Sequence, residues 1–307
     1  MKVHNNYLLT IAFGIGASVY IFSILNVPTQ TGGESLSPLE PFFNTTQAYI
    51  LPVSDPSNFP IAYSDAGKPV ISAKAALVYD LNSDRILFSR NPRTKLPVAS
   101  LTKLVTALVV REYTDLREEV IVPKEAVRVD KEKQDLFANE TLTTEQLLTV
   151  MLVGSSNDAA YALSSHVASK GINFVEAMNR KAMEIGMTES QFIDPAGLDD
   201  KGYSTAQDIA KLLKRALRDN VIQEILITPA VSLGDRQFKN TNQLLDSINN
   251  IQGGKTGNTE TALGCMVLSV DIGNRRDTII TVVLGSRGRF EETQILVNWA
   301  LTSHRWE

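Results

Sequence analysis

The segment 7–27 constrains this chain more than any other feature, because it contains no charged residue and is rich in large apolar side chains. A helix needs about 20 such residues to cross the hydrocarbon core of a bilayer, and this segment is close to that length. A cleaved signal peptide more typically has a shorter apolar core and small residues at its cleavage site, whereas residues 23–28 lack an A-x-A pattern. The sequence therefore favours an uncleaved membrane anchor over residues 1–27.

Positively charged residues predict the orientation of this anchor. Lys2 and the terminal amine precede the apolar segment, and no further Lys or Arg occurs until Lys68. Because positive charge is retained on the cytoplasmic side, the N-terminus is expected in the cytoplasm. The rest of the chain is then expected to lie outside the cell membrane, held there by a single transmembrane helix.

Residues 28–70 are expected to form an extended linker, since they hold seven of the twelve prolines and show little apolar periodicity. The stretch 48–53 is apolar enough to dock on the domain that follows. Residues 71–307 are predicted to form that domain, and the hydrophobic fraction of 43% is ordinary for a globular protein with a buried core.

Composition excludes several classes of function. The formal net charge is -4, and no basic run is present that would attract nucleic acid. The single cysteine, Cys265, rules out an intrachain disulfide and a cysteine-based metal cage, and it is expected to be a small buried apolar residue. No metal and no cofactor is expected.

Apolar periodicity and turn residues place strands at both ends of the domain and helices between them. A hairpin is expected around the turn 80–84, and Thr143 with Gln146 forms a capping box before a helix that Gly154 ends. The predicted strands are 75–79, 85–88, 262–270 and 278–284, and the predicted helices are 98–112, 145–153, 158–168, 174–185, 205–217 and 290–302. This order is typical of an α+β fold.

Ser100 and Lys103 lie three residues apart at the start of a predicted helix, so the serine hydroxyl and the lysine amine can meet on one face. A serine is a poor nucleophile until a base removes its proton, and a desolvated lysine with a lowered pKa can serve as that base. Alone, this spacing is a weak signal, because a serine and a lysine often fall three residues apart by chance.

Ser155 and Asn157 fall in a break between two apolar helices, where polar groups need hydrogen-bond partners. The simpler interpretation is a pair of helix caps, which Gly154 and Asp158 fit well.

The segment 253–259 contains three glycines around Lys255 and Thr256, which would let a ligand approach the backbone beside a charge and a hydroxyl. A glycine turn with a surface lysine is the simpler interpretation. The segment is not a phosphate-binding P-loop, because Asn249 stands where that motif requires glycine.

Taken together and in this order, Ser-x-x-Lys, Ser-x-Asn and Lys-Thr-Gly resemble the motifs of the penicillin-interacting serine hydrolases, which comprise penicillin-binding proteins and serine β-lactamases. His4, His166 and His304 lie before the anchor, in a helix and in the tail, so a Ser-His-Asp triad has no obvious base. Within the group, the chain resembles the low-molecular-weight D-alanyl-D-alanine carboxypeptidases from about Ala75 to Trp299. The local contexts that carry this resemblance are 97–103, 194–198 and Arg289, ten residues before Trp299.

The resemblance implies an antiparallel sheet of about five strands flanked by helices, with a mostly helical subdomain, as in β-lactamases and transpeptidases. It also implies a serine peptidase that removes the terminal D-alanine of peptidoglycan stem peptides through an acyl-enzyme, with β-lactam antibiotics as covalent inhibitors. The implied catalytic residues are Ser100 as nucleophile, Lys103 as base, Ser155 as proton relay to the leaving D-alanine, and Asn157, which holds the substrate amide and orients Lys103.

Substrate binding is implied for Lys255, Thr256, Gly257 and Asn258, with the backbone N–H groups of Ser100 and Asn258 forming an oxyanion hole. Arg289 would bind the terminal carboxylate. The segment 194–198 reads as a simple Pro-Gly turn without a catalytic role. Two departures stand out: Gln207 replaces a common arginine, and the chain ends at Glu307, so that an N-terminal tether is expected to do the anchoring.

Three alternatives share the motifs. A β-lactamase of class A needs a Glu-x-x-Leu-Asn segment, which is not found after Asn157. A non-catalytic penicillin-sensing or peptidoglycan-binding domain is disfavoured by the retained Ser100, Lys103 and Ser155. Endopeptidase action on D-alanyl cross-links would use the same residues and stays open.

We predict that the domain is accessible from outside the cytoplasmic membrane and stays membrane-bound, because segment 7–27 lacks a cleavage site. Protease accessibility in spheroplasts, fractionation and N-terminal sequencing measure this. A mature N-terminus near Pro28 would refute the anchor.

Overall fold

The computed structural model describes residues 59–64, 67–129, 135–273 and 277–306. The predicted anchor, 1–27, and most of the predicted linker, 28–70, lie outside this range, so both stay predictions. Within the described ranges, no helix is both long enough and apolar enough to cross a membrane.

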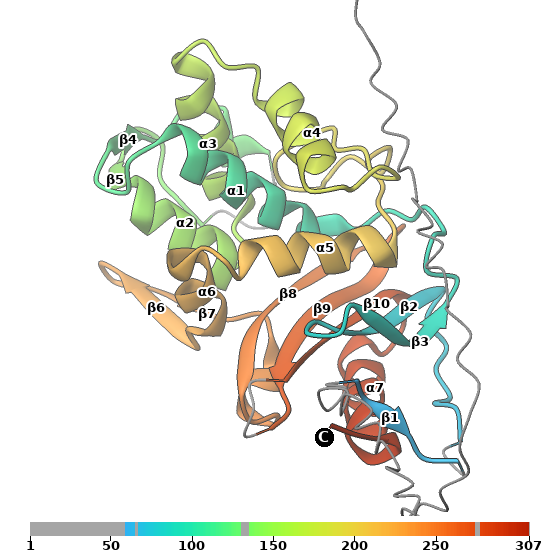
Figure 1. Ribbon diagram of the computed structural model, residues 1–307. Helices are drawn as coiled ribbons and strands as arrows, with labels where there is room; N and C mark the ends of the chain where they lie inside the picture. Colours follow the sequence, from blue (N-terminus) through green and yellow to red (C-terminus); the bar gives the residue numbers. More distant parts are fainter. Residues whose placement is uncertain (1–58, 65–66, 130–134, 274–276, 307) are drawn as a thin grey trace, which may run out of the picture. The chain divides into compact units, whose positions relative to one another are not determined.

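The centre of the domain is a five-stranded antiparallel sheet with the strand order β3-β2-β10-β9-β8 (Figure 1). Its strands are β2 (Ala75–Asp80), β3 (Arg85–Arg90), β8 (Ile251–Thr259), β9 (Leu263–Asp271) and β10 (Thr278–Ser286). Strand β2 pairs with β10, so the first hairpin and the last three strands join across the whole length of the domain. The predicted α+β class and the five-stranded sheet are confirmed.

Both faces of the sheet are buried, because successive side chains of a strand point to opposite faces. On β9, Cys265 and Val267 belong to one hydrophobic core, whereas Met266, Leu268 and Val270 belong to a second. The first core also contains the residues of α1 to α5, and the second is closed by Leu296, Val297 and Ala300 of the C-terminal helix. The sheet is therefore a central layer between two helical layers.

Most helices precede β8 and form the helical subdomain on one side of the sheet, whereas α7 covers the other side (Figure 1). The helices are α1 (Lys103–Tyr113), α2 (Thr144–Val153), α3 (Asn157–Ser169), α4 (Phe174–Glu184), α5 (Ala206–Ala216), α6 (Asn220–Ile227) and α7 (Arg289–Ser303). In α1, every residue from 103 to 110 is buried, which is typical of a helix at the centre of a bundle.

Three small two-stranded sheets complete the domain: β1 (Ile61–Ala62) with β11 (His304–Arg305), β4 (Glu119–Ile121) with β5 (Thr141–Thr143), and β6 (Ala230–Leu233) with β7 (Arg236–Lys239). The Tyr63 amide also donates to the carbonyl oxygen of Ser303 at 2.9 Å. The described end of the predicted linker is thus paired with the C-terminal end of the domain.

Several local predictions are confirmed. The capping box of Thr143 and Gln146 is present, and Gly154 is the C-cap of α2. Cys265 is buried, and burial raises the pKa of its thiol to about 11. The predicted helix 98–112 differs at its start, because Ala99 has a φ of +48° and a 3-10 turn, η1 (Ala99–Thr102), precedes α1.

Strand β8 was not evident from its composition, because glycine disfavours strands. Its glycines allow close packing instead. A Cβ atom at Gly253 would lie 2.7 Å from Leu217 Cδ2, and one at Gly254 would lie 2.8 Å from Leu268 Cδ1. The α6 helix and the β6–β7 hairpin were also not predicted.

Candidate active site

The geometry of η1 brings Ser100 and Lys103 together. In a 3-10 turn, side chains three residues apart are eclipsed, and Lys103 Nζ lies 2.8 Å from Ser100 Oγ. Lys103 is fully buried, whereas Ser100 is partly exposed. Ala99, directly before Ser100, adopts a left-handed conformation that costs free energy for a residue other than glycine. The predicted hydroxyl–amine contact is therefore present and exposed to a ligand on the serine side.

Lys103 donates two further hydrogen bonds, to Asn157 Oδ1 at 2.7 Å and to the carbonyl oxygen of Ala196 at 3.0 Å. Neither acceptor is a carboxylate. Three oxygen atoms thus hold the amine in one position, with Asn157 on one side and the 194–199 loop on the other. The arrangement fixes the lysine amine against the Ser100 hydroxyl.

In the break between α2 and α3, Ser156 caps the start of α3. Its hydroxyl accepts from the Ala159 amide at 3.2 Å, so it is the N-cap of α3. Ser155 has a φ of +58°, another left-handed conformation outside glycine. Ser155 and Asn157 lie on either side of this cap. Ser155 accepts a hydrogen bond from Lys255, and Asn157 accepts one from Lys103.

The second lysine, Lys255, comes from β8 and is also buried. Its Nζ lies 2.9 Å from Ser155 Oγ. The next residue, Thr256, donates from its hydroxyl to the hydroxyl of Thr241 at 2.6 Å. Two serine–lysine pairs are therefore present: Ser100 with Lys103 on η1 and α1, and Ser155 with Lys255 between the α2–α3 break and β8.

Strand β8 runs directly beside the Ser100 backbone. A Cβ atom at Gly257 would lie 2.7 Å from the Val98 carbonyl oxygen and 3.1 Å from the Ser100 nitrogen, so only glycine fits without a shift. The amides of Ser100 and of the neighbouring Asn258 thus belong to adjacent segments, as an oxyanion hole made from both requires.

Arg289, the first residue of α7, lies over the end of β8. Its Nη1 donates to Asn258 Oδ1 at 3.2 Å, while its buried Nε has no hydrogen-bond partner within the described ranges. Burial lowers the pKa of this guanidinium. The contact is to β8 and not to a carbonyl of its own helix, which favours a role at the site over a role at the helix end.

Asp194 was not predicted as a functional residue, yet its carboxylate organises the loop that holds Lys103. Its two oxygens accept from the amides of four residues at 2.7 to 3.2 Å: Ala196, Gly197, Leu198 and Asp199. Gly197, with a φ of +78°, lies so close to Ala99 that a Cβ atom would be 2.0 Å from its carbonyl oxygen. The signal in the sequence is the Asp-Pro pair, since aspartate side chains commonly accept from the amides that follow them.

Other candidate residues lie elsewhere. His166 contacts Glu118 at 2.8 Å, and the ring of His304 packs on that of Trp299 at 5.0 Å between centroids. Gln207 lies near the start of α5, where it lines a pocket with Tyr79 of β2 and Ile86 of β3. Thr241 was missed, because it lies in an irregular segment without a local signal.

Comparison with known proteins shows the family of this chain. Residues 63–288 match the family model of the D-alanyl-D-alanine carboxypeptidases. The D-alanyl-D-alanine endopeptidase of Escherichia coli (strain K12) is 30% identical over 78% of this chain and 81% of its own. The carboxypeptidase DacC of the same organism is 33% identical over 75% of this chain and 62% of its own. Penicillin-binding protein D2 of Listeria monocytogenes, solved with bound cefotaxime, is 28% identical, has a TM-score of 0.69, and covers 76% and 99% of the two chains.

We predict that Asp194→Asn slows acylation by penicillin about tenfold or more. The substitution removes the charged acceptor that holds the loop of Ala196, whose carbonyl oxygen in turn holds Lys103. The loss of one charged hydrogen bond corresponds to a rate change of about this size. Stopped-flow labelling with a fluorescent penicillin measures the rate. The matched control is Asp200→Asn, whose carboxylate is exposed and bonds to Thr261. An unchanged acylation rate in a folded Asp194→Asn protein would contradict this role.

Proposed function

This chain belongs to the D-alanyl-D-alanine carboxypeptidase family of serine peptidases, and we propose that Ser100 forms the acyl-enzyme through which it removes the terminal D-alanine of peptidoglycan stem peptides. The observation that carries the proposal is the 2.8 Å contact between Lys103 Nζ and Ser100 Oγ, made by a lysine that is fully buried. A neutral amine in that position can accept the hydroxyl proton directly.

Acylation begins when Lys103 takes the Ser100 proton and Oγ attacks the carbonyl carbon of the penultimate D-alanine. The negative charge that develops on the carbonyl oxygen is stabilised by the backbone N–H groups of Ser100 and Asn258. These donors are fixed by the fold before substrate binds, because the Gly257 backbone packs directly against η1. Asn157, while holding Lys103, is placed to bind the amide of the acyl part of the substrate.

Departure of D-alanine requires a proton on its amine. As a proton relay, Ser155 gives its hydroxyl proton to this amine and takes up in turn the proton that Lys103 removed from Ser100, which leaves Lys103 neutral again. The adjacent Lys255 ammonium, 2.9 Å away, keeps the Ser155 hydroxyl oriented and electrostatically favours the anionic leaving residue. Thr256 and Arg289 bind the carboxylate of the leaving residue. A water molecule then attacks the ester carbon and gives a proton to the neutral Lys103, which passes it to Ser100 Oγ as the bond between the ester carbon and Oγ breaks, so that the serine hydroxyl and the amine are both restored.

A β-lactam presents a strained amide to the same nucleophile, and the resulting ester on Ser100 explains covalent inhibition of such a site. The family acts on the cell wall outside the cytoplasm. For this chain, segment 1–27 would tether the domain to the membrane and the linker 28–70 would extend it toward the cell wall.

We predict that Ser100→Ala abolishes both covalent penicillin labelling and hydrolysis of a D-Ala-D-Ala pentapeptide without unfolding the protein, because the hydroxyl alone forms the acyl bond. Intact-protein mass spectrometry and product analysis measure the two activities. Ser165→Ala is the control, since this serine is exposed on α3. Covalent penicillin labelling that persists in the Ser100→Ala protein would refute the mechanism.

We predict that Arg289→Lys weakens kcat/KM for D-Ala-D-Ala peptides by about 1–3 kcal/mol, since a lysine cannot form the two parallel hydrogen bonds of a guanidinium with a carboxylate. An amidated peptide should lose much less. Steady-state kinetics on both peptides measure the difference, and Arg287→Lys at the neighbouring exposed arginine is the control. Equal losses on the two substrates, or none on either, would assign Arg289 to the helix end instead.

A further inference from the structure

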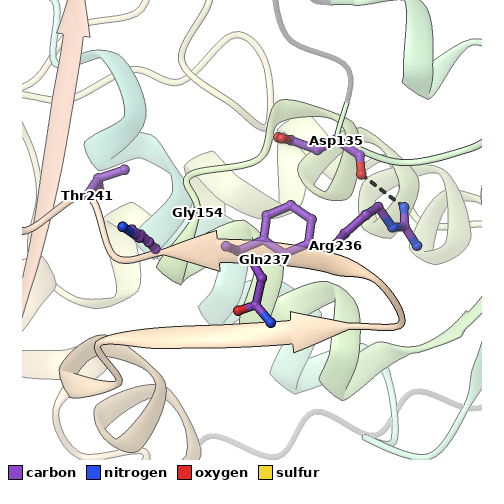
Figure 2. Close-up of a pocket in the computed structure, with 7 residues that line it drawn as sticks. Asp135, Gly154, Arg236, Gln237 and Thr241 are labelled. Carbon is purple, nitrogen blue, oxygen red and sulfur yellow. Dashed lines mark hydrogen bonds between the residues drawn. The ribbon is translucent and has the colours of Figure 1, made fainter.

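Of the two residues proposed above to bind the terminal carboxylate, only Arg289 carries a charge. The other, Thr256, is neutral, and its hydroxyl already donates to Thr241, which also lines the cavity beside β7 (Figure 2). The neighbouring Lys255 ammonium donates to the Ser155 hydroxyl and to the carbonyl oxygen of Thr256. Selectivity for a free carboxylate over a blocked one therefore depends on Arg289.

Three neighbouring groups hold the Arg289 side chain. Strand β9 lies against its stem, because a Cβ atom at Gly264 would be 3.1 Å from Arg289 Cβ and 3.3 Å from its Cδ. The Phe290 ring packs on the guanidinium, with 4.6 Å between the ring centroid and Cζ. The third group is Asn258, whose Oδ1 accepts from Nη1 at 3.2 Å. A side chain held in this way loses little conformational freedom when a ligand binds.

The strand register explains how an arginine of α7 reaches β8. Asn258 pairs with Gly264 in the antiparallel ladder of β8 and β9, and paired residues present their side chains to the same face. Since Gly264 has no side chain, the stem of Arg289 can cross β9 at this position and place its guanidinium beside Asn258. The contact is made by the exposed side chain of Asn258, so it leaves the backbone amide of this residue available for the oxyanion hole.

The acceptor on Asn258 is neutral, and this leaves the charge of Arg289 uncompensated. A carboxylate at the same distance would pair with the guanidinium and take up much of its charge. Within the part of the chain that the structure describes, Arg289 forms no ion pair, and its buried Nε has no hydrogen-bond partner. The guanidinium is thus held in place while its charge and one of its donors stay available to an anion.

We propose that the side chain of Asn258 is a positioning residue that sets the selectivity for a free terminal carboxylate. It holds the Arg289 guanidinium at the end of β8 without neutralising it, so that the charge acts on the substrate. This inference rests on the proposed function of Ser100 and Arg289. It gives Asn258 a second role, exerted by its side chain through Arg289 and separate from that of its backbone amide.

The test uses a D-Ala-D-Ala pentapeptide and the same peptide amidated at its C-terminus, with the full chain and its Asn258→Asp and Asn258→Ala variants. The readout is the selectivity, defined as kcat/KM for the free peptide divided by kcat/KM for the amidated one. A negative charge near the oxyanion hole slows the reaction of both peptides, and this effect cancels in the ratio.

Asn258→Asp keeps the shape of the side chain, but its carboxylate pairs with Arg289 and repels the carboxylate of the substrate. The selectivity is therefore expected to fall about tenfold or more. Asn258→Ala removes only the acceptor, and a fall of about two- to tenfold is expected, the scale of one hydrogen bond. Asn298→Asp is the matched control, since it adds the same charge at an exposed position of α7 and should leave the selectivity within about twofold.

A double-mutant cycle shows whether Asn258 acts through Arg289. In an Arg289→Ala background, Asn258→Ala should change the selectivity by less than about twofold, because no guanidinium is left to hold. A purely structural role of Asn258 would give the same change in both backgrounds and would overturn the inference.

The remaining outcomes separate this inference from the proposed function. If the unaltered chain prefers the free carboxylate and Asn258→Asp keeps that preference, only this inference fails. An unaltered chain that cleaves both peptides equally well also overturns it, while the acyl-enzyme on Ser100 stands. If neither peptide is cleaved and penicillin does not label Ser100, the proposed function itself fails.

Discussion

The active site depends on one interaction, the burial of the Lys103 amine among three neutral oxygen atoms. In its neutral form the amine has two hydrogens, for which Asn157 Oδ1 and the Ala196 carbonyl oxygen are the acceptors, and a lone pair that faces the Ser100 hydroxyl. These partners matter because an unsatisfied polar group in the interior costs several kcal/mol. The acceptors come from η1, α3 and the 194–199 loop, three segments far apart in the chain. Holding one side chain therefore fixes the relative positions of all three segments, and with them Ser100, the proposed nucleophile.

Two structural devices keep these segments in place. Asp194 folds its loop around one carboxylate, and Gly197 lets that loop lie against the Ala99 backbone. Gly257 lets β8 approach the same backbone from the other side. The η1 turn is thus held between two glycine contacts, which explains how Ala99 maintains a left-handed conformation directly before the nucleophile.

Much of this architecture was predictable from local patterns. The apolar periodicity of their segments predicted α4 and α5 to within two residues of their observed ends. The capping box of Thr143 and Gln146 predicted the start of α2. Strand β8 could not be predicted from a local pattern. Its glycines are required by close contacts with Leu217, Leu268 and Val98, and only the folded chain creates these contacts. Thr241 could not be predicted either, since it lies in an irregular segment without a sequence period.

The site residues present a different case, because their motifs are individually weak and gain meaning only in combination. The capping interpretation is confirmed for Gly154, the C-cap of α2, whereas the N-cap of α3 is Ser156, between Ser155 and Asn157, and not Asp158. A cap requires the chain to leave the helix, and this exit turns the flanking side chains toward Lys255 and Lys103. The helix break between α2 and α3 is therefore both a structural boundary and the element that delivers two polar side chains to the site.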